Sequence, residues 1–125
     1  MRLRNTGTSV LHLLTWGTPF EDAWFQPFVV LRQGGRTLPF GGASVKRGEP
    51  AADEYLRFSA GQTRQASLDL ADVFDLSAPG RYDVEPRVVL HDVVAAPGRP
   101  PRPRAHHRAL ELACRRVSFE ITRAR

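Results

Sequence analysis

Four histidines are the side chains of this chain best suited to bind a metal or transfer a proton: His12, His91, His106 and His107. A helical His-Glu-x-x-His zinc site needs two histidines one turn apart and a glutamate that activates water. None of the four is followed by glutamate. His106 and His107 are adjacent, and neighbours in an extended chain point to opposite sides, so they do not close a site together. We therefore expect no catalytic residue, no metal site and no cofactor.

Two further residue types could carry chemistry, a cysteine and a group of aspartates. Cys114 is the only cysteine, so it cannot form a disulfide within the chain. It alternates with Leu112, which predicts a buried structural thiol. Asp69, Asp72 and Asp75 resemble a calcium cluster, but they lack the glycine and terminal glutamate of an EF-hand loop. A role at the start of a helical turn is the simpler interpretation of Asp69 or Asp72.

Aromatic and basic side chains supply the candidate partner-binding residues: Trp16, Phe20, Trp24, Lys46 and Arg47. The three aromatic residues gather around one Thr-Pro step, and aromatic side chains commonly anchor protein interfaces. A role in the core or in anchoring a loop is the alternative. Lys46 and Arg47 lie in an irregular segment, which predicts either a solvated loop or a basic loop that reaches an acidic partner or a protease cleft.

The net charge of +5 is concentrated in one part of the chain. Residues 1–98 carry 10 Lys/Arg and 11 Asp/Glu, whereas residues 99–125 carry 8 Arg and 2 Glu. No aromatic stacking platform lies in residues 97–118, so single-stranded nucleic-acid binding is not expected. No run of 18 apolar residues predicts a membrane span, and no signal peptide is visible at the N-terminus.

The apolar pattern has a period of two, which is typical of β-strands. Gln33-Gly34-Gly35-Arg36 is a hairpin turn signal. About seven short strands separated by turns predict a single all-β domain over residues 1–125, an immunoglobulin-like antiparallel β-sandwich. The expected strands cover residues 10–14, 25–32, 37–40, 55–58, 62–70, 81–94 and 109–121.

Two irregularities are expected near the C-terminus. The apolar residues of the last strand lie at even-numbered positions before Arg115-Arg116 and at odd-numbered positions after it. This change predicts a β-bulge in the last strand. Residues 97–107 contain four prolines, which prevent regular ladder pairing. We therefore expect a flexible, solvated Pro/Arg-rich loop before the last strand, and one that folding does not require.

Three groups of short motifs follow one another along residues 3–92. They are Leu3-Arg4-Asn5-Thr6-Gly7 with Trp16-Gly17-Thr18-Pro19, then Val45-Lys46-Arg47-Gly48-Glu49-Pro50, then Leu68-Asp69-Leu70 with Pro79-Gly80-Arg81-Tyr82. Their order resembles the non-catalytic N-terminal β-sandwich domain of deuterolysin-like zinc metallopeptidases, the aspzincin and peptidyl-Lys type. The Trp-Gly-Thr-Pro and Val-Lys-Arg-Gly-x-Pro motifs carry most of this resemblance.

The chain departs from that family pattern in two respects. Members of the family have a strand before Asn-Thr-Gly, so here the first family strand is expected to be missing and residues 9–14 to present a free sheet edge. The family's third zinc ligand lies in a Gly-Thr-x-Asp motif, whereas Phe20 occupies that position after Gly17-Thr18. No zinc ligand can therefore be assigned from the resemblance.

The resemblance implies a non-catalytic accessory or prodomain-like module that binds, chaperones or inhibits an aspzincin-type metallopeptidase, with the peptidase catalytic domain as its partner. One alternative is an N-terminal fragment of a full metallopeptidase. Another is an independent protein-binding or adhesion module. A homodimer formed by edge-strand pairing is also expected if the edge at residues 9–14 is free. The family context is secreted or periplasmic, and the sequence leaves the location open.

Overall fold

The computed structural model describes residues 1–122 and builds them mainly from short β-strands. The strands are β1 (Arg2–Arg4), β2 (Leu11–Leu14), β3 (Val29–Gln33), β4 (Arg36–Thr37), β5 (Tyr55–Phe58), β6 (Thr63–Gln65), β7 (Gly80–Pro86), β8 (Val88–Leu90), β9 (Val93–Ala95), β10 (Leu110–Leu112) and β11 (Val117–Ile121). Single 3-10 turns form η1 (Pro19–Glu21), η2 (Ala52–Glu54), η3 (Leu70–Asp72) and η4 (Arg104–His106). The all-β prediction is confirmed for the described residues. None of their helical turns has the length and apolar character needed to cross a membrane.

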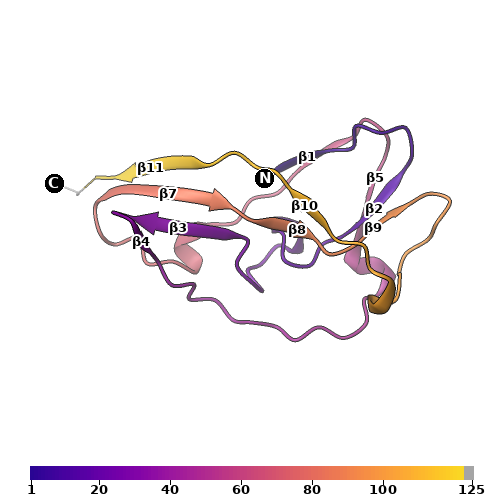
Figure 1. Ribbon diagram of the computed structural model, residues 1–125, viewed down its shortest axis with the longest axis horizontal. Coiled ribbons are helices and arrows are strands. Elements are labelled where there is room, and N and C mark those ends of the chain that lie inside the picture. Colours follow the sequence, from indigo (N-terminus) through magenta and orange to yellow (C-terminus); the bar gives the residue numbers. More distant parts are fainter. Residues whose placement is uncertain (123–125) are drawn as a thin grey trace.

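The described residues form four small antiparallel sheets, with strand orders β11-β7-β3-β4, β5-β2-β9, β1-β6 and β10-β8. The first sheet lies at one end of the elongated molecule, and β2, β5 and β9 lie at the other (Figure 1). Strands β8 and β10 lie between them (Figure 1). The predicted hairpin is confirmed, because β3 and β4 pair through Gln33 and Arg36. Gly34 and Gly35 both have positive φ in the turn, a conformation that favours glycine.

Alternation along the strands decides which side chains enter the core. In β7, Tyr82 and Val84 are buried, whereas Asp83 between them and Arg81 before them are exposed. Among the described residues three buried clusters result, one around β3 and β7 and two around β2 and β5. Their most buried members are Leu31, Tyr82 and Phe74; Leu14, Trp16 and Val94; and Leu13, Phe58 and Leu90.

The predicted bulge is confirmed by the strand register. Leu112 pairs with Val88, and Val117 pairs with Val84. Residues 112 and 117 are five positions apart, whereas their partners 88 and 84 are four positions apart. The C-terminal strand therefore carries one extra residue. Cys114 lies in this interruption and is exposed. The prediction of a buried thiol is therefore wrong, because the alternation that would bury it stops at Leu112.

The expected free edge at residues 9–14 is also wrong. Strand β2 pairs with β5 on one side and with β9 on the other. After β8 the chain turns at His91-Asp92 and crosses to β2, where Leu14 N–H donates to Asp92 O at 3.0 Å. The sequence predicted one strand over residues 81–94 and did not show that its end changes sheets.

The Pro/Arg-rich loop lacks ladder pairing, as predicted, but it is not simply solvated. The Arg102 guanidinium forms an ion pair with the fully buried Asp92 at 3.0 Å and also donates to Val93 O. The Nε2 atom of His107 hydrogen-bonds the backbone carbonyl oxygen of Arg102 at 2.7 Å, and the carbonyl oxygen is the acceptor. The loop is therefore anchored to the body by its own basic side chains, which composition alone did not reveal.

Several predicted strands are shorter in the structure. Strand β3 begins at Val29 rather than at residue 25, and only residues 63–65 of the expected strand over 62–70 pair. Strand β4 ends at Thr37, although Leu38 is buried and its N–H still donates to Leu31 O at 2.8 Å. The helical turn near Leu70 is confirmed, and the Asp69 side chain caps it by accepting from Ala71 N–H at 2.9 Å.

Candidate functional site

The three aromatic candidates do not form one cluster. Trp24 stacks on Phe28 with ring centroids 4.3 Å apart and belongs to the cluster at the β4 end. Phe20 meets Phe58 edge-on at 6.0 Å in a second cluster. Trp16 is buried in a third. The prediction that they gather around the Thr-Pro step is wrong, because the three side chains pack in three different core clusters.

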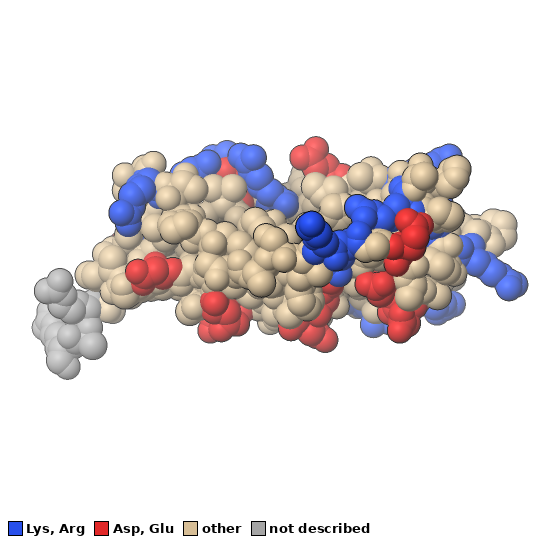
Figure 2. Space-filling model, turned by 90° about the horizontal axis from the view of Figure 1, so that it is seen from below, with Lys and Arg blue, Asp and Glu red and all other residues tan. Residues whose placement is uncertain are grey.

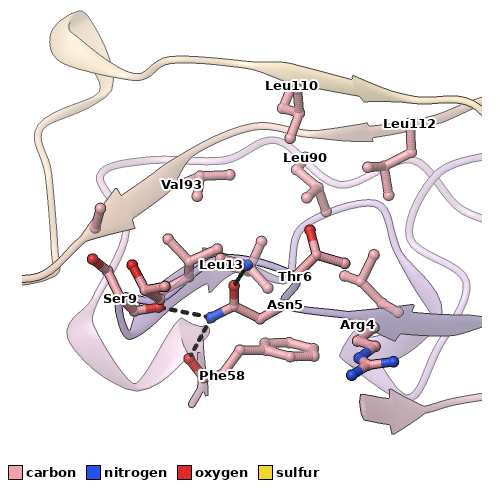
Figure 3. Close-up of a pocket in the computed structure, with 15 residues that line it drawn as sticks. Arg4, Asn5, Thr6, Ser9, Leu13, Phe58, Leu90, Val93, Leu110 and Leu112 are labelled. Atoms are coloured by element: carbon pink, nitrogen blue, oxygen red, sulfur yellow. Dashed lines mark hydrogen bonds between the residues drawn. The ribbon is translucent and has the colours of Figure 1, made fainter. Parts of the chain in front are cut away.

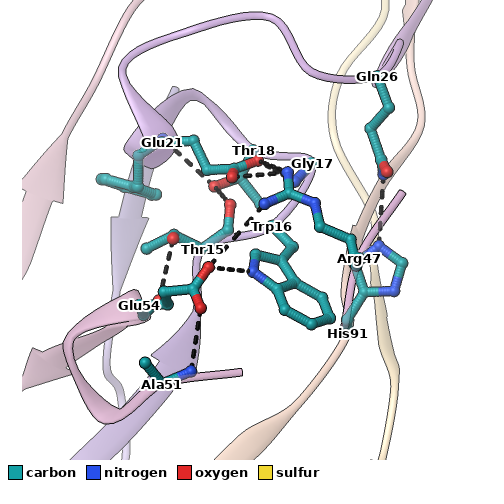
Figure 4. A network of polar contacts seen from close by, with 11 residues as sticks. Thr15, Trp16, Gly17, Thr18, Glu21, Gln26, Arg47, Ala51, Glu54 and His91 are labelled. Atoms are coloured by element: carbon teal, nitrogen blue, oxygen red, sulfur yellow. Dashed lines mark hydrogen bonds and ion pairs between the residues drawn. The ribbon is translucent and has the colours of Figure 1, made fainter. Parts of the chain in front are cut away.

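Trp16 is the centre of a polar network (Figure 4). Its indole Nε1–H donates to the Glu54 carboxylate at 2.6 Å. The guanidinium carbons of Arg47 and Arg104 lie over its ring, 5.1 and 5.7 Å from the centroid. The His107 ring meets it edge-on at 6.1 Å. One buried indole thus joins three separate stretches of the chain, and cation–π contacts add to its apolar packing.

Arg47 turns inward rather than projecting from the surface. Its guanidinium pairs with Glu21 at 2.6 Å and lies 4.0 Å from Glu54, and its side chain is only 16% exposed. Glu21 also accepts from Gly17 N–H at 2.7 Å, which ties the turn after β2 to the irregular segment that carries Arg47. Lys46 beside it is exposed. The basic-loop hypothesis therefore applies to Lys46 and not to Arg47.

Glu54 is held as a carboxylate. The hydrogen bond from Trp16 lowers its pKa most, followed by the Ala51 N–H bond and the charge of Arg47, and together these outweigh the opposing effect of burial. Its backbone carbonyl accepts from both N–H and Oγ1–H of Thr15, at 3.0 and 2.9 Å. The segment after β2 and the turn η2 are therefore fixed to each other.

A polar pocket of about 420 Å³ opens beside this network. It is lined by Trp16, Gln26, Val45, Arg47, His91, Arg104, His107 and Ala109. None of these lining residues is acidic, and two of them are permanently charged donors. Burial first, and then the nearby positive charges, lower the pKa of His91, so its imidazole is neutral near pH 7. Gln26 lies 3.3 Å from a ring nitrogen of His91. Such a donor-rich hollow on an aromatic floor suits a carboxylate or carbonyl oxygen.

A second pocket, of about 450 Å³, has a different character (Figure 3). Leucine, valine and phenylalanine side chains from β1, β2, β5, β8, β9 and β10 form its apolar lining. Its polar wall is the segment around Asn5, whose side-chain amide donates to Ser9 O and Phe58 O and accepts from Gly7 N–H. Because Asn5 is already satisfied within the chain, this pocket is suited to apolar groups.

Surface charge does not point to one ligand class. On the face seen in Figure 2, Lys and Arg side chains lie mainly along the upper part and Asp and Glu mainly along the lower part, and both signs mix toward the right. In residues 1–122 no group of three or more His, Cys, Asp or Glu side chains is placed to hold a metal ion.

Sequence reasoning missed Glu54, His91, Arg104 and His107 as members of the Trp16 site. They come from separate segments that meet only in the folded chain. Only the motif that contains Lys46 and Arg47 could have pointed to this site from the sequence. Both interpretations of that motif place it at the surface, whereas the Arg47 side chain turns inward.

Comparison with known proteins gives a partial relationship. No protein-family model matches the chain. An extracellular protease of Aeromonas hydrophila is 32% identical over 85 residues, which is 67% of this chain and 24% of that protein. Neutral protease 2 homologues of Sclerotinia sclerotiorum and Blastomyces gilchristii are 36% and 34% identical over 61% and 64% of this chain, and over 21% and 23% of their own lengths. The chain is thus partly homologous to deuterolysin-like neutral proteases over about two thirds of its length, and it spans about a quarter of the relatives it matches.

Proposed function

We propose that this chain is a non-catalytic accessory module that binds the catalytic domain of a deuterolysin-like metallopeptidase. The observation that carries the proposal is the partial homology with three proteins whose names describe proteases. Most of this chain takes part in the match, but less than a quarter of each protease does. A shared region of that size fits a supporting module better than a complete peptidase.

The immunoglobulin-like sandwich is part of this proposal. Residues 2–14 pair with residues 55–65 first through β1 and β6 and then through β2 and β5. The C-terminal strand pairs with one partner segment in the same stepwise way. The four small sheets then correspond to two longer, interrupted ones. Two antiparallel sheets around a common core are what a sandwich module requires.

The Trp16 end of the molecule, defined by the polar pocket and the segments 42–49 and 102–108 around it, is the proposed docking face. Hydrogen bonds and ion pairs already fix these segments through Glu54, Arg47 and Arg102. A surface fixed before binding loses less conformational entropy in the complex. The N–H groups of Arg104 and Gln26 would donate hydrogen bonds to acidic side chains or carbonyl groups of the peptidase.

Isothermal titration of the full chain into a purified deuterolysin-like catalytic domain tests the proposal. We expect saturable binding with one site. Arg104→Ala removes an exposed donor from the pocket and should weaken binding at least about tenfold, the scale of one good interface contact.

Arg36→Ala is the matched control, because Arg36 is an exposed arginine of the β3–β4 hairpin at the other end of the molecule. This variant should bind like the wild type. Absence of heat with several such catalytic domains would favour an independent binding module instead. Equal losses for both variants would mean that binding does not use the Trp16 end.

A further inference from the structure

Strand β11 has one edge that pairs with no other strand within residues 1–122. It pairs with β7 and is the outermost strand of the sheet β11-β7-β3-β4. With five residues, it is the longest edge strand in the part of the chain that the structure describes. The opposite edge, β4, has two residues and is followed closely by Pro39, which blunts it. The outer N–H and C=O groups of β11 could therefore pair with another strand.

The sequence along this edge is complementary to itself. Along an edge strand, the N–H and C=O groups of every second residue point outward. When two identical strands pair antiparallel, outward-pointing residues must face each other, so the two-fold axis of the pair passes through a residue and not between two residues. Centred on Ser118, the pairing places Arg116 of each copy opposite Glu120 of the other. Arg116 is the residue just before β11, and it also pairs with Glu85 of its own copy at 2.9 Å. It also places Val117 opposite Phe119 on the other face of the sheet. The neighbouring registers, centred on Val117 or Phe119, lose the Arg–Glu match.

Exposure agrees with this register. Val117 is 51% exposed although it lies on the same side of β11 as Phe119, which packs against the core. Glu120 is also exposed. Opposite charges directly across a strand pair stabilise it, whereas like charges destabilise it.

We propose that two copies of this chain associate by antiparallel pairing of β11 with β11, centred on Ser118. The two-fold operation makes the contact self-complementary and closed. It extends the four-stranded sheet into a continuous eight-stranded one. The contact is small, so the association should be weak and should depend on protein concentration. It uses the end of the molecule opposite the Trp16 face and does not depend on the proposed peptidase partner.

Site-specific crosslinking tests the register. In a Cys114→Ser background, Ser118→Cys places the two thiols directly opposite each other, within the separation that a disulfide requires. We expect a covalent dimer on mild oxidation. Glu120→Cys is the matched control on the same face, because its two copies would lie about 13 Å apart along the strands. It should crosslink at least about tenfold more slowly.

Charge reversal tests the association without a covalent bond. Glu120→Arg places two arginines opposite each other at each end of the pairing and should weaken dimerisation at least about tenfold by sedimentation. Asp53→Arg makes the same charge change on the exposed turn η2 and should leave dimerisation unchanged. Melting curves of all variants confirm that each is folded. A folded wild type that stays monomeric at high micromolar concentration, or equal crosslinking at positions 118 and 120, would overturn the proposal.

Discussion

The buried carboxylate of Asp92 holds together the turn between β8 and β9. Asp92 is fully buried and accepts from Tyr55 Oη–H at 2.8 Å and from Arg108 N–H at 3.0 Å, in addition to its ion pair with Arg102. Burial alone would raise its pKa, but these hydrogen bonds outweigh burial and the pKa of Asp92 is lowered. The charge is therefore kept, and its partners are held in place.

Tyr55 provides a test of this turn at alkaline pH. Burial, followed by the hydrogen bond to Asp92, raises the pKa of Tyr55 from 10.0 to about 12. The native state therefore favours the neutral phenol, and its contribution is complete below pH 10 and is lost as the pH rises toward 12. The difference corresponds to about 3 kcal/mol. Denaturant unfolding between pH 9 and 12 should show this decline.

Tyr55→Phe should show a lower stability at pH 9 and a shallower decline above pH 10. If the variant loses stability with pH as steeply as the wild type, the hydroxyl of Tyr55 is not the group responsible.

Cys114 should react freely in the native protein, because the bulge leaves it exposed. A thiol reagent such as Ellman's reagent should modify it about as fast as it modifies the unfolded chain, with no change in the melting temperature. Protection by more than about a hundredfold would require opening of structure before reaction, and would show that the thiol packs in the core after all.

At the scale of elements, the Pro/Arg-rich loop is anchored to the body of the protein by its own side chains and is not a free linker. Arg102→Ala leaves the charge of Asp92 buried without its cationic partner. Breaking a buried pair costs about 3–5 kcal/mol, and the quarter exposure of the Arg102 side chain places the expected loss near the lower bound, at about 3 kcal/mol.

Arg99→Ala is the control within the same loop, since Arg99 is exposed. Its free energy of unfolding should stay within about 0.5 kcal/mol of the wild type. Equal, negligible effects of the two substitutions would restore the original expectation of a dispensable loop.

The elements that the sequence predicted well are those determined by local pattern. Alternation placed β5 at Tyr55–Phe58, two glycines placed the β3–β4 turn, and a parity change placed the bulge before β11. The pairing of β9 with β2 could not be predicted, because a three-residue strand carries too little pattern to specify its partner. The same holds for the site, where Trp16 was a candidate but its partners lie far away in the sequence.

For the whole molecule, the structure separates two surfaces. The Trp16 face lies at the end that carries β2, β5 and β9, whereas β11 lies at the other end (Figure 1). A dimer formed through β11 would therefore leave both Trp16 faces accessible. The proposed partner binding and the proposed self-association can be tested one without the other.

In the proposed function, the Trp16 end docks on a deuterolysin-like catalytic domain. Hydrogen exchange of the full chain, measured alone and with excess catalytic domain, tests it most directly. We predict slower exchange in residues 42–49 and 102–108 in the mixture and unchanged exchange in the β3–β4 hairpin, residues 33–36. Unchanged exchange throughout, or protection confined to the hairpin end, would contradict the claim.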